Sequence, residues 1–457
     1  MIILTGTSIS TGIAIGSPVF WSQGSNPLAL LSPKSSVLVG DYLSPSEVEL
    51  LNLGRFSGLA LEIGGVTSHT AIMARTFGIP AVFGVKNLLK KCQGSRLIVI
   101  DGTNGRVILE PNVAILEKVK RERRRYQSIQ SKFRRTKDIL AITADGHRVE
   151  VAANVGSVSD VKTAFTNGAE GVGVFRTELL YINSSNLPSE DEHYNTYERA
   201  VQIAKGKPVI IRTLDIGGDK YPKYLTFPVE GNPFLGLRGI RYCLKYPEVF
   251  KPQLSAALRV AAQGDVKLML PMVSKVEEIL AFNRLLNRIK SRLKARGEAH
   301  DANLSIGTMI EVPAAVEIID ELSDHLDFFS IGTNDLIQYI EAVDRLNDNV
   351  ADSFDPYHPA IFRTINRIVK KAHARKKWVG ICGEMAADPL VTPALIGLGV
   401  DELSMASASI PMIKFIIRQL DKQMCTEHCV ELLRAKSSEE ITKRMQLFAK
   451  ANHIYSI

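Results

Sequence analysis

The stretch Leu304-Ser305-Ile306-Gly307-Thr308-Met309-Ile310-Glu311 is a largely apolar run that ends in a carboxylate. The run Phe328–Gly332 repeats this pattern and leads into Asn334 and Asp335. Short apolar runs of this kind are typical of strands buried in a parallel sheet. About eight of them, each with room for a helix before the next, predict a (β/α)₈ barrel. The expected strands are His147–Asn154, Gly171–Arg176, Pro208–Thr213, Lys267–Val273, Leu304–Glu311, Phe328–Gly332, Trp378–Cys382 and Glu402–Met405.

The rest of the chain divides around this barrel. An open doubly wound sheet is the alternative fold for the C-terminal part, but the chain has no Gly-x-Gly-x-x-Gly fingerprint. Residues 1–110 alternate short β-like runs with glycine turns, which predicts a compact α/β domain. Residues 111–138 contain no glycine and almost only helix formers, so we expect a stiff linker helix there. The barrel then occupies residues 139–457.

In a barrel of this type the chemistry lies at the C-terminal ends of the strands. Arginine side chains bind phosphate and carboxylate groups through two parallel hydrogen bonds, so several of them predict a small substrate with more than one negative charge. Two carboxylates beside such a site suggest Mg²⁺ held partly by protein and partly by substrate. The expected strand-end residues are Arg176, Arg212, Glu311, Asn334, Asp335 and Cys382, with Arg238 and Arg345 in loops after strands.

Two of the expected site residues allow more than one role. Cys382 could be a general acid, a nucleophile or a buried apolar residue. In the first domain, His69 follows Gly64-Gly65-Val66-Thr67-Ser68 at the predicted start of a helix, where Thr67 or Ser68 can be the cap. Free N–H groups at a helix start favour an anion and a neutral, nucleophilic imidazole, so His69 could accept a phosphoryl group. The alternative is a histidine near a helix cap without chemistry.

Composition narrows the classes of protein. Hydrophobic residues make up 45% of the 457 residues and charged residues 23%, which is ordinary for a soluble globular protein. No apolar run reaches the ~20 residues of a membrane span, and the N-terminus does not resemble a signal peptide, so we expect a cytoplasmic protein. The five cysteines suggest neither disulfides nor a zinc site. The basic run 118–125 is interpreted as a solvated helix face rather than a nucleic-acid site. The chain also has no P-loop.

These motifs resemble enzyme I of the bacterial sugar phosphotransferase system, a PEP-utilising enzyme (PEP, phosphoenolpyruvate). Gly64–Arg75 resembles the phosphohistidine signature of that family. Further motifs of the family occur in family order along essentially the whole chain, in the segments Gly171–Glu178, Arg212–Lys220, Asn232–Arg238, Glu311–Ala315, Ser330–Leu336, Ala342–Arg345 and Cys382–Glu384.

The resemblance implies a swivelling phosphohistidine domain joined by the long helix to a PEP-binding barrel. Arg176, Arg212, Asn334 and Arg345 would hold the phosphate and carboxylate of PEP, with help from Arg238. Glu311 and Asp335 would ligate Mg²⁺, and Asp335 would also lie against the substrate. The Nε2 atom of His69 would attack phosphorus, and Cys382 would protonate the departing pyruvate enolate.

One departure from the family concerns the phosphoryl acceptor. Family members carry a helical subdomain that docks the carrier protein HPr, but here residues 22–33 are followed at once by Ser36–Ser46, which matches the family after that insert. The acceptor is therefore expected to be HPr, bound weakly, or another histidine-containing protein. Leu346 also stands where the family usually has glycine. Family resemblance further implies a homodimer formed through the barrel. A relative of pyruvate phosphate dikinase or PEP synthase, and a non-enzymatic PEP sensor, are the alternatives.

Overall fold

The computed structural model describes residues 1–21, 36–44, 47, 55–65, 68–76, 78–218, 221–222, 224–225, 227–347, 349–452 and 454. It divides into two compact units, Met1–Lys132 and Phe133–Ser456. Val66 and Thr67 of the predicted cap, Asp219 and Lys220, and residues 22–33 lie outside the described residues, as does the side chain of His69. No helix in the described ranges is long and apolar enough to cross a membrane.

The first unit is built on one eight-stranded sheet with the order β1-β8-β7-β3-β4-β5-β6-β2. Strands β3 to β6 pair in parallel, and the other pairs are antiparallel. Its elements are β1 (Ile2–Thr5), β2 (Thr7–Ser10), β3 (Ile13–Trp21), β4 (Ser36–Gly40), β5 (Gly58–Leu61), α2 (His69–Thr76), β6 (Ala81–Phe83), α3 (Leu88–Cys92), β7 (Ile98–Asp101) and β8 (Arg106–Leu109).

Side chains that alternate between the two faces of the sheet in the first unit belong to two separate apolar clusters. Leu59 and Leu61 pack with Ala71 and Ala74 of α2 in one cluster, whereas Ala60 belongs to another. Because successive side chains on a strand point to opposite faces, β5 therefore holds α2 against one face of the sheet. The long helix α4 (Val113–Thr136) follows β8, within the segment where a helix is expected.

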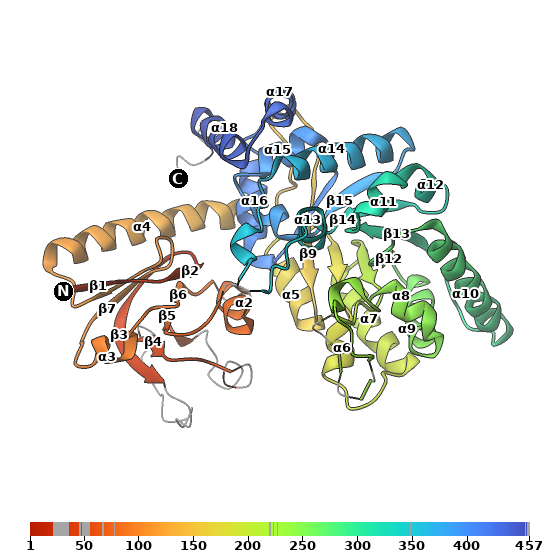
Figure 1. Ribbon diagram of the computed structural model, residues 1–457, viewed down its shortest axis with the longest axis horizontal. Helices are drawn as coiled ribbons and strands as arrows, with labels where there is room; N and C mark the ends of the chain where they lie inside the picture. Colours follow the sequence, from red (N-terminus) through yellow and green to blue (C-terminus); the bar gives the residue numbers. More distant parts are fainter. Residues whose placement is uncertain are drawn as a thin grey trace. The chain divides into compact units, whose positions relative to one another are not determined.

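The second unit is a closed barrel of eight parallel strands (Figure 1), which confirms the predicted barrel. The strands are β9 (Glu150–Val155), β10 (Val172–Phe175), β11 (Val209–Arg212), β12 (Val266–Leu270), β13 (Ser305–Ile310), β14 (Phe328–Ile331), β15 (Trp378–Ile381) and β16 (Glu402–Met405). The helices are α5 (Val158–Thr166), α6 (Glu178–Ile182), α7 (Glu190–Ala204), α8 (Ile240–Lys245), α9 (Pro247–Ala261), α10 (Val276–Ala295), α11 (Pro313–Glu317), α12 (Ile319–Ser323), α13 (Thr333–Glu341), α14 (Pro359–Ala374), α15 (Thr392–Leu398), α16 (Ile410–Ile417), α17 (Lys422–Arg434) and α18 (Ser438–Ala451).

The predicted strand bounds differ from the structure by up to three residues, for local reasons. The first strand is expected to begin at His147, but Arg148 forms an isolated bridge with Ile142, and β9 starts at Glu150. The fourth strand is expected to end at Val273, but Met272 has a φ of 60° and β12 ends at Leu270. A methionine in the left-handed region ends a strand at some cost in strain, which is common next to functional sites.

Candidate functional site

The predicted site residues of the second unit all follow the C-terminal ends of barrel strands. Arg176 and Arg212 stand at the ends of β10 and β11, Glu311 follows β13, and Cys382 follows β15. Asn334 and Asp335 lie in the first turn of α13, just beyond β14 rather than at its end. Arg238 precedes α8, and Arg345 follows α13.

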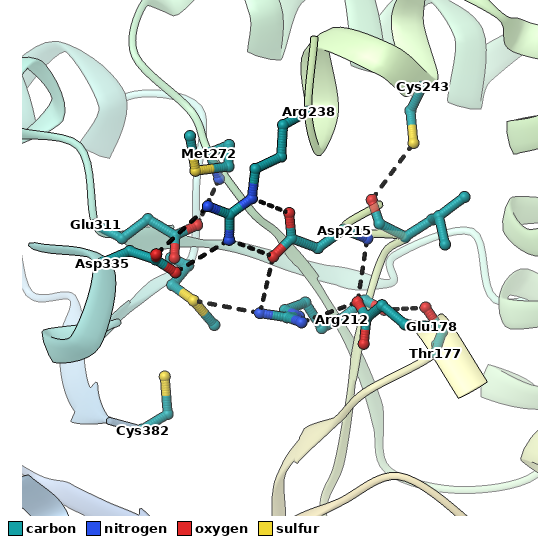
Figure 2. Close-up of polar contacts among 12 residues, drawn as sticks. Thr177, Glu178, Arg212, Asp215, Arg238, Cys243, Met272, Glu311, Asp335 and Cys382 are labelled. Atoms are coloured by element: carbon teal, nitrogen blue, oxygen red, sulfur yellow. Dashed lines mark hydrogen bonds and ion pairs between the residues drawn. The ribbon is translucent and has the colours of Figure 1, made fainter. Parts of the chain in front are cut away.

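Arg238 connects two carboxylates at the centre of the site (Figure 2). Its Nε and Nη2 atoms donate to the two oxygens of Asp215 at 3.0 and 3.1 Å, and Nη2 also lies 3.1 Å from Asp335 Oδ2. Its Nη1 lies 3.4 Å from both Asp335 Oδ1 and the hydroxyl of Tyr339. Burial alone would lower the pKa of Arg238, but Asp215 and Asp335 more than offset it and raise that pKa. Arg238 is therefore a permanent cation, and protein groups already engage its donors.

Arg212 also contacts two carboxylates, those of Glu178 and Asp215. Its Nη2 donates to Glu178 Oε1 at 2.8 Å, and its Nη1 lies 3.3 Å from Asp215 Oδ2. Glu178 Oε1 also accepts from the backbone N–H of Asp215. No role for Glu178 or Asp215 was predicted from the sequence. The signal that could have revealed them is that buried arginines need carboxylate partners, and both residues lie within the motifs that carry the arginines.

Glu311 is fully buried, and only one of its oxygens is satisfied. Its Oε1 accepts from the N–H of Met272 at 2.7 Å, so the left-handed turn after β12 serves to hold this carboxylate. Its Oε2 has no hydrogen-bond partner among the described residues. Burial first, and then the charges of Asp335 and Asp215, raise the pKa of Glu311. The charges of Arg238 and Arg212 offset part of this rise. A buried carboxylate oxygen without a hydrogen-bond partner fits a place for a cation.

The two carboxylates Glu311 and Asp335 suit a divalent metal only if other ligands complete its shell. In the part of the chain that the structure describes, no group of three or more His, Cys, Asp or Glu residues could hold a metal. Mg²⁺ commonly takes one or two carboxylates from the protein and the rest of its ligands from water and substrate phosphate. The residues present therefore fit a metal that binds together with an anionic substrate.

Cys382 lies at the mouth of the barrel interior. It is 5% exposed and packs in a cluster with Val174, Met309 and Phe328. Burial raises the pKa of its thiol to about 11, so the thiol carries its proton at neutral pH. It is therefore both a buried apolar residue and a potential acid, whereas a thiolate nucleophile is not favoured.

The loop after Cys382 packs closely against the start of α13. A Cβ atom on Gly383 would lie 1.8 Å from Thr333 Oγ1 and 2.8 Å from Thr333 N, so only glycine permits this approach. The N–H of Glu384 donates to Asn334 Oδ1 at 2.9 Å, which turns the amide nitrogen of Asn334 away from that contact. The packing of the 383–384 loop against α13 thus positions both the Cys382 thiol and the first turn of α13, which carries Asn334 and Asp335.

Several buried polar atoms at this end of the barrel have no partner among the described residues. They include Arg212 Nε, Thr213 Oγ1, Glu311 Oε2, Thr333 Oγ1 and Arg345 Nη1. Unpaired buried polar atoms are rare in native proteins, and a group of them in one place indicates a missing ligand or water. Four donors or hydroxyls and one carboxylate oxygen without a partner suit an anion with an accompanying cation.

His69 is the first residue of α2 in the first unit, as predicted. Ser68 Oγ accepts from the N–H of Ala71 at 3.2 Å, so Ser68 caps this helix. N–H groups in the first turn of a helix suit a bound anion.

The chain matches two family models. The PEP-binding domain of PEP-utilising enzymes matches residues 130–422, and their mobile domain matches residues 32–105. A phosphoenolpyruvate-protein phosphotransferase of Bacillus sp. (strain S) is 43% identical over 417 residues, which cover 91% of this chain and 72% of the relative. The Bacillus subtilis protein of the same name is 41% identical, with 89% and 71% covered. That of Buchnera aphidicola is 40% identical, with 90% and 72% covered.

The relatives therefore contain sequence that has no counterpart in this chain. Here β3 ends at Trp21 and β4 begins at Ser36, and these adjacent strands pair in parallel. The connection of 14 residues between them is too short for a helical HPr-binding subdomain. The matches to both family models and to these relatives show that the chain belongs to the phosphoenolpyruvate-protein phosphotransferase (enzyme I) family of PEP-utilising enzymes.

Proposed function

We propose that this protein takes the phosphoryl group of PEP onto His69 and releases pyruvate, and then passes the phosphoryl group to a carrier protein as the first step of sugar uptake or its regulation. PEP-dependent phosphoryl transfer is the activity named for its relatives. The observation that carries the proposal is the group of unpaired buried atoms among arginines and carboxylates at the barrel mouth. PEP carries a phosphate and a carboxylate, and such a site would neutralise both.

The proposed roles follow from position and charge. Arg176, Arg212, Arg345 and Asn334 bind the phosphate and carboxylate of PEP. Arg238 stays on Asp215 and Asp335 and adds positive charge to the site. Transfer of a phosphoryl group is accelerated mainly by positioning and charge neutralisation, so these contacts supply most of the catalysis.

The chemical step requires a nucleophile and an acid. The Nε2 lone pair of His69 attacks phosphorus, and the bond from phosphorus to the enolate oxygen of PEP breaks. The thiol of Cys382 then gives its proton to the enolate carbon, which yields pyruvate. The raised pKa of Cys382 supports this role because the proton is present at neutral pH.

PEP-utilising enzymes use a divalent metal ion, and we propose Mg²⁺ for this one. Glu311 and Asp335 would hold it, and Asp335 would thereby also lie against the substrate. When bound, the metal would neutralise charge on the substrate oxygens.

The remaining parts of the proposal concern organisation. Residues 1–110 would form the phosphohistidine domain, 111–138 the linker helix and 139–457 the PEP-binding barrel. The protein would act in the cytoplasm as a homodimer formed through the barrel. The acceptor would be HPr, bound weakly without the helical subdomain, or another histidine-containing protein.

The test is incubation with PEP and Mg²⁺ followed by intact-mass analysis of the chain, with His69→Ala as the control. An acid-labile phosphate that the control lacks supports the proposal. If the protein binds PEP but is not phosphorylated, the proposal is contradicted and a PEP sensor is favoured. Phosphorylation by ATP in the presence of phosphate would favour a relative of pyruvate phosphate dikinase. Slow transfer from the labelled chain to HPr is expected, and rapid transfer at low HPr concentration would contradict weak docking.

A further inference from the structure

One buried amide, that of Gln253 on α9, forms hydrogen bonds to the residues that follow both β10 and β11. Gln253 is 0% exposed. Its Nε2 donates to Thr177 Oγ1 at 3.0 Å and to the hydroxyl of Tyr197 at 3.2 Å. Its Oε1 accepts from the backbone N–H of Leu214 at 3.0 Å. The hydroxyl of Thr177 in turn donates to the backbone carbonyl of Arg212 at 3.0 Å.

The amide of Gln253 fixes the direction of the hydrogen bonds between Leu214, Thr177 and Arg212. Since Gln253 is the donor to both hydroxyls, Thr177 must give its own proton to the Arg212 carbonyl. The hydroxyl of Tyr197 also lies 3.0 Å from Nδ1 of His193, and the histidine tautomer decides which of the two donates. Burial lowers the pKa of His193 to about 4, which keeps the ring neutral. Among side chains of this size, only glutamine offers two donors and one acceptor in one plane.

These hydrogen bonds hold the backbone next to Arg176 and Arg212. Thr177 directly follows Arg176, and the bonded carbonyl of Arg212 and the N–H of Leu214 lie on either side of Thr213. Arg212 has Glu178 to direct its side chain. Arg176 is exposed, and no hydrogen bond or ion pair joins its side chain to a residue in the described ranges. The position from which the Arg176 side chain extends is therefore set by the backbone at the end of β10.

We propose that Gln253 is a positioning residue for PEP, which sets the spacing of Arg176 and Arg212 by linking Thr177 to Leu214. The inference rests on the proposed function, because it assumes that these arginines bind the substrate. Gln253 itself does not touch the substrate; it acts through the backbone of two strands.

The test measures PEP affinity and labelling separately. Variants Gln253→Met, Thr177→Val and the double variant are made in the His69→Ala background, in which calorimetry with PEP and Mg²⁺ reads binding without transfer. The same variants with His69 present give the initial rate of labelling by PEP. The matched control is Ser323→Ala, which removes another buried hydrogen bond, from Ser323 Oγ to the carbonyl of Ile319, at the opposite end of the barrel before β14.

If Arg176 and Arg212 lose their spacing, either single variant should bind PEP about tenfold more weakly. A few weakened contacts to charged groups cost a factor of this order. The double variant should be no weaker than the weaker-binding single variant, because both changes break the same link. Ser323→Ala should lower the melting temperature but change PEP affinity less than twofold. If Gln253→Met does not fold, Thr177→Val alone carries the test.

Unchanged PEP affinity in Gln253→Met or Thr177→Val would overturn the inference, as would an equal weakening in Ser323→Ala. If the parent protein binds PEP but is never labelled, the proposed transfer fails, whereas the effect of Gln253 on affinity still decides this inference. If the parent does not bind PEP at all, both are overturned.

Discussion

The buried contacts of Asp215 predict the effect of removing its charge. Asp215 faces Arg238 through two hydrogen bonds of 3.0 and 3.1 Å and Arg212 at 3.3 Å. The side chains are 3%, 9% and 12% exposed, respectively, so solvent screens these pairs little. Breaking a buried ion pair by removing one partner costs about 3–5 kcal/mol. Asparagine keeps one acceptor, so we expect Asp215→Asn to lower the free energy of unfolding by about 3 kcal/mol.

The assay is urea unfolding in a double-mutant cycle with Arg238→Met. Once Arg238 is gone, the charge of Asp215 has lost its main partner, so the two changes should not add. We expect a coupling energy of about 2 kcal/mol, within the range for residues that share a buried contact. The control is Glu248→Gln, which breaks an exposed pair with Lys251 at 2.6 Å and should cost less than about 1 kcal/mol.

The reasoning is refuted if the two changes add within about 0.5 kcal/mol, the usual limit for independent sites. It is equally refuted if Asp215→Asn costs no more than Glu248→Gln. Either result would mean that Arg238 is not held between Asp215 and Asp335 in solution.

Three further changes have defined outcomes. Burial, and then Glu150, raise the pKa of Glu402 to about 8 from its usual 4.5. The folded protein therefore holds this proton more tightly than the unfolded chain, and it should lose stability as pH rises from 4.5 to about 8. Glu402→Gln should remove that loss, and a fall in urea midpoint between about pH 6 and pH 9 that is equal in the variant and the parent would contradict this. Cys382→Ala should slow pyruvate formation by about 10²-fold or more with PEP affinity nearly unchanged, and a wild-type rate in a coupled pyruvate assay would exclude the thiol as the acid. Gly383→Ala should weaken both PEP binding and labelling, because its Cβ would meet Thr333 at 1.8 Å; full activity would show that the loop shifts freely.

The barrel could be predicted because its strands are buried on both faces. Runs such as Leu304–Glu311 are apolar almost throughout, and a polar residue directly after such a run must lie at one end of the barrel. The ends of strands were harder to predict. Met272 stops β12 by adopting a left-handed conformation that no local sequence rule requires, and its N–H bonds a carboxylate 39 residues away.

The polar contacts behind the site could not be predicted from the sequence. Gln253 lies on a helix 76 residues from Thr177, and nothing in α9 marks it as different from other polar residues. Glu178 and Asp215 stand inside recognisable motifs, but their pairing with arginines depends on how neighbouring strands come together. The sequence allows Cys382 to be an acid, a nucleophile or a buried apolar residue. Burial raises the pKa of its thiol and so disfavours the nucleophile.

The most direct test of the central claim is a stoichiometry measured in one turnover. The protein is mixed with excess PEP and Mg²⁺, released pyruvate is counted, and tandem mass spectrometry locates phosphate on the chain. The proposed function predicts one pyruvate for each chain phosphorylated, with the phosphate on His69. Pyruvate released without phosphate on the chain, or phosphate on another residue, would contradict it.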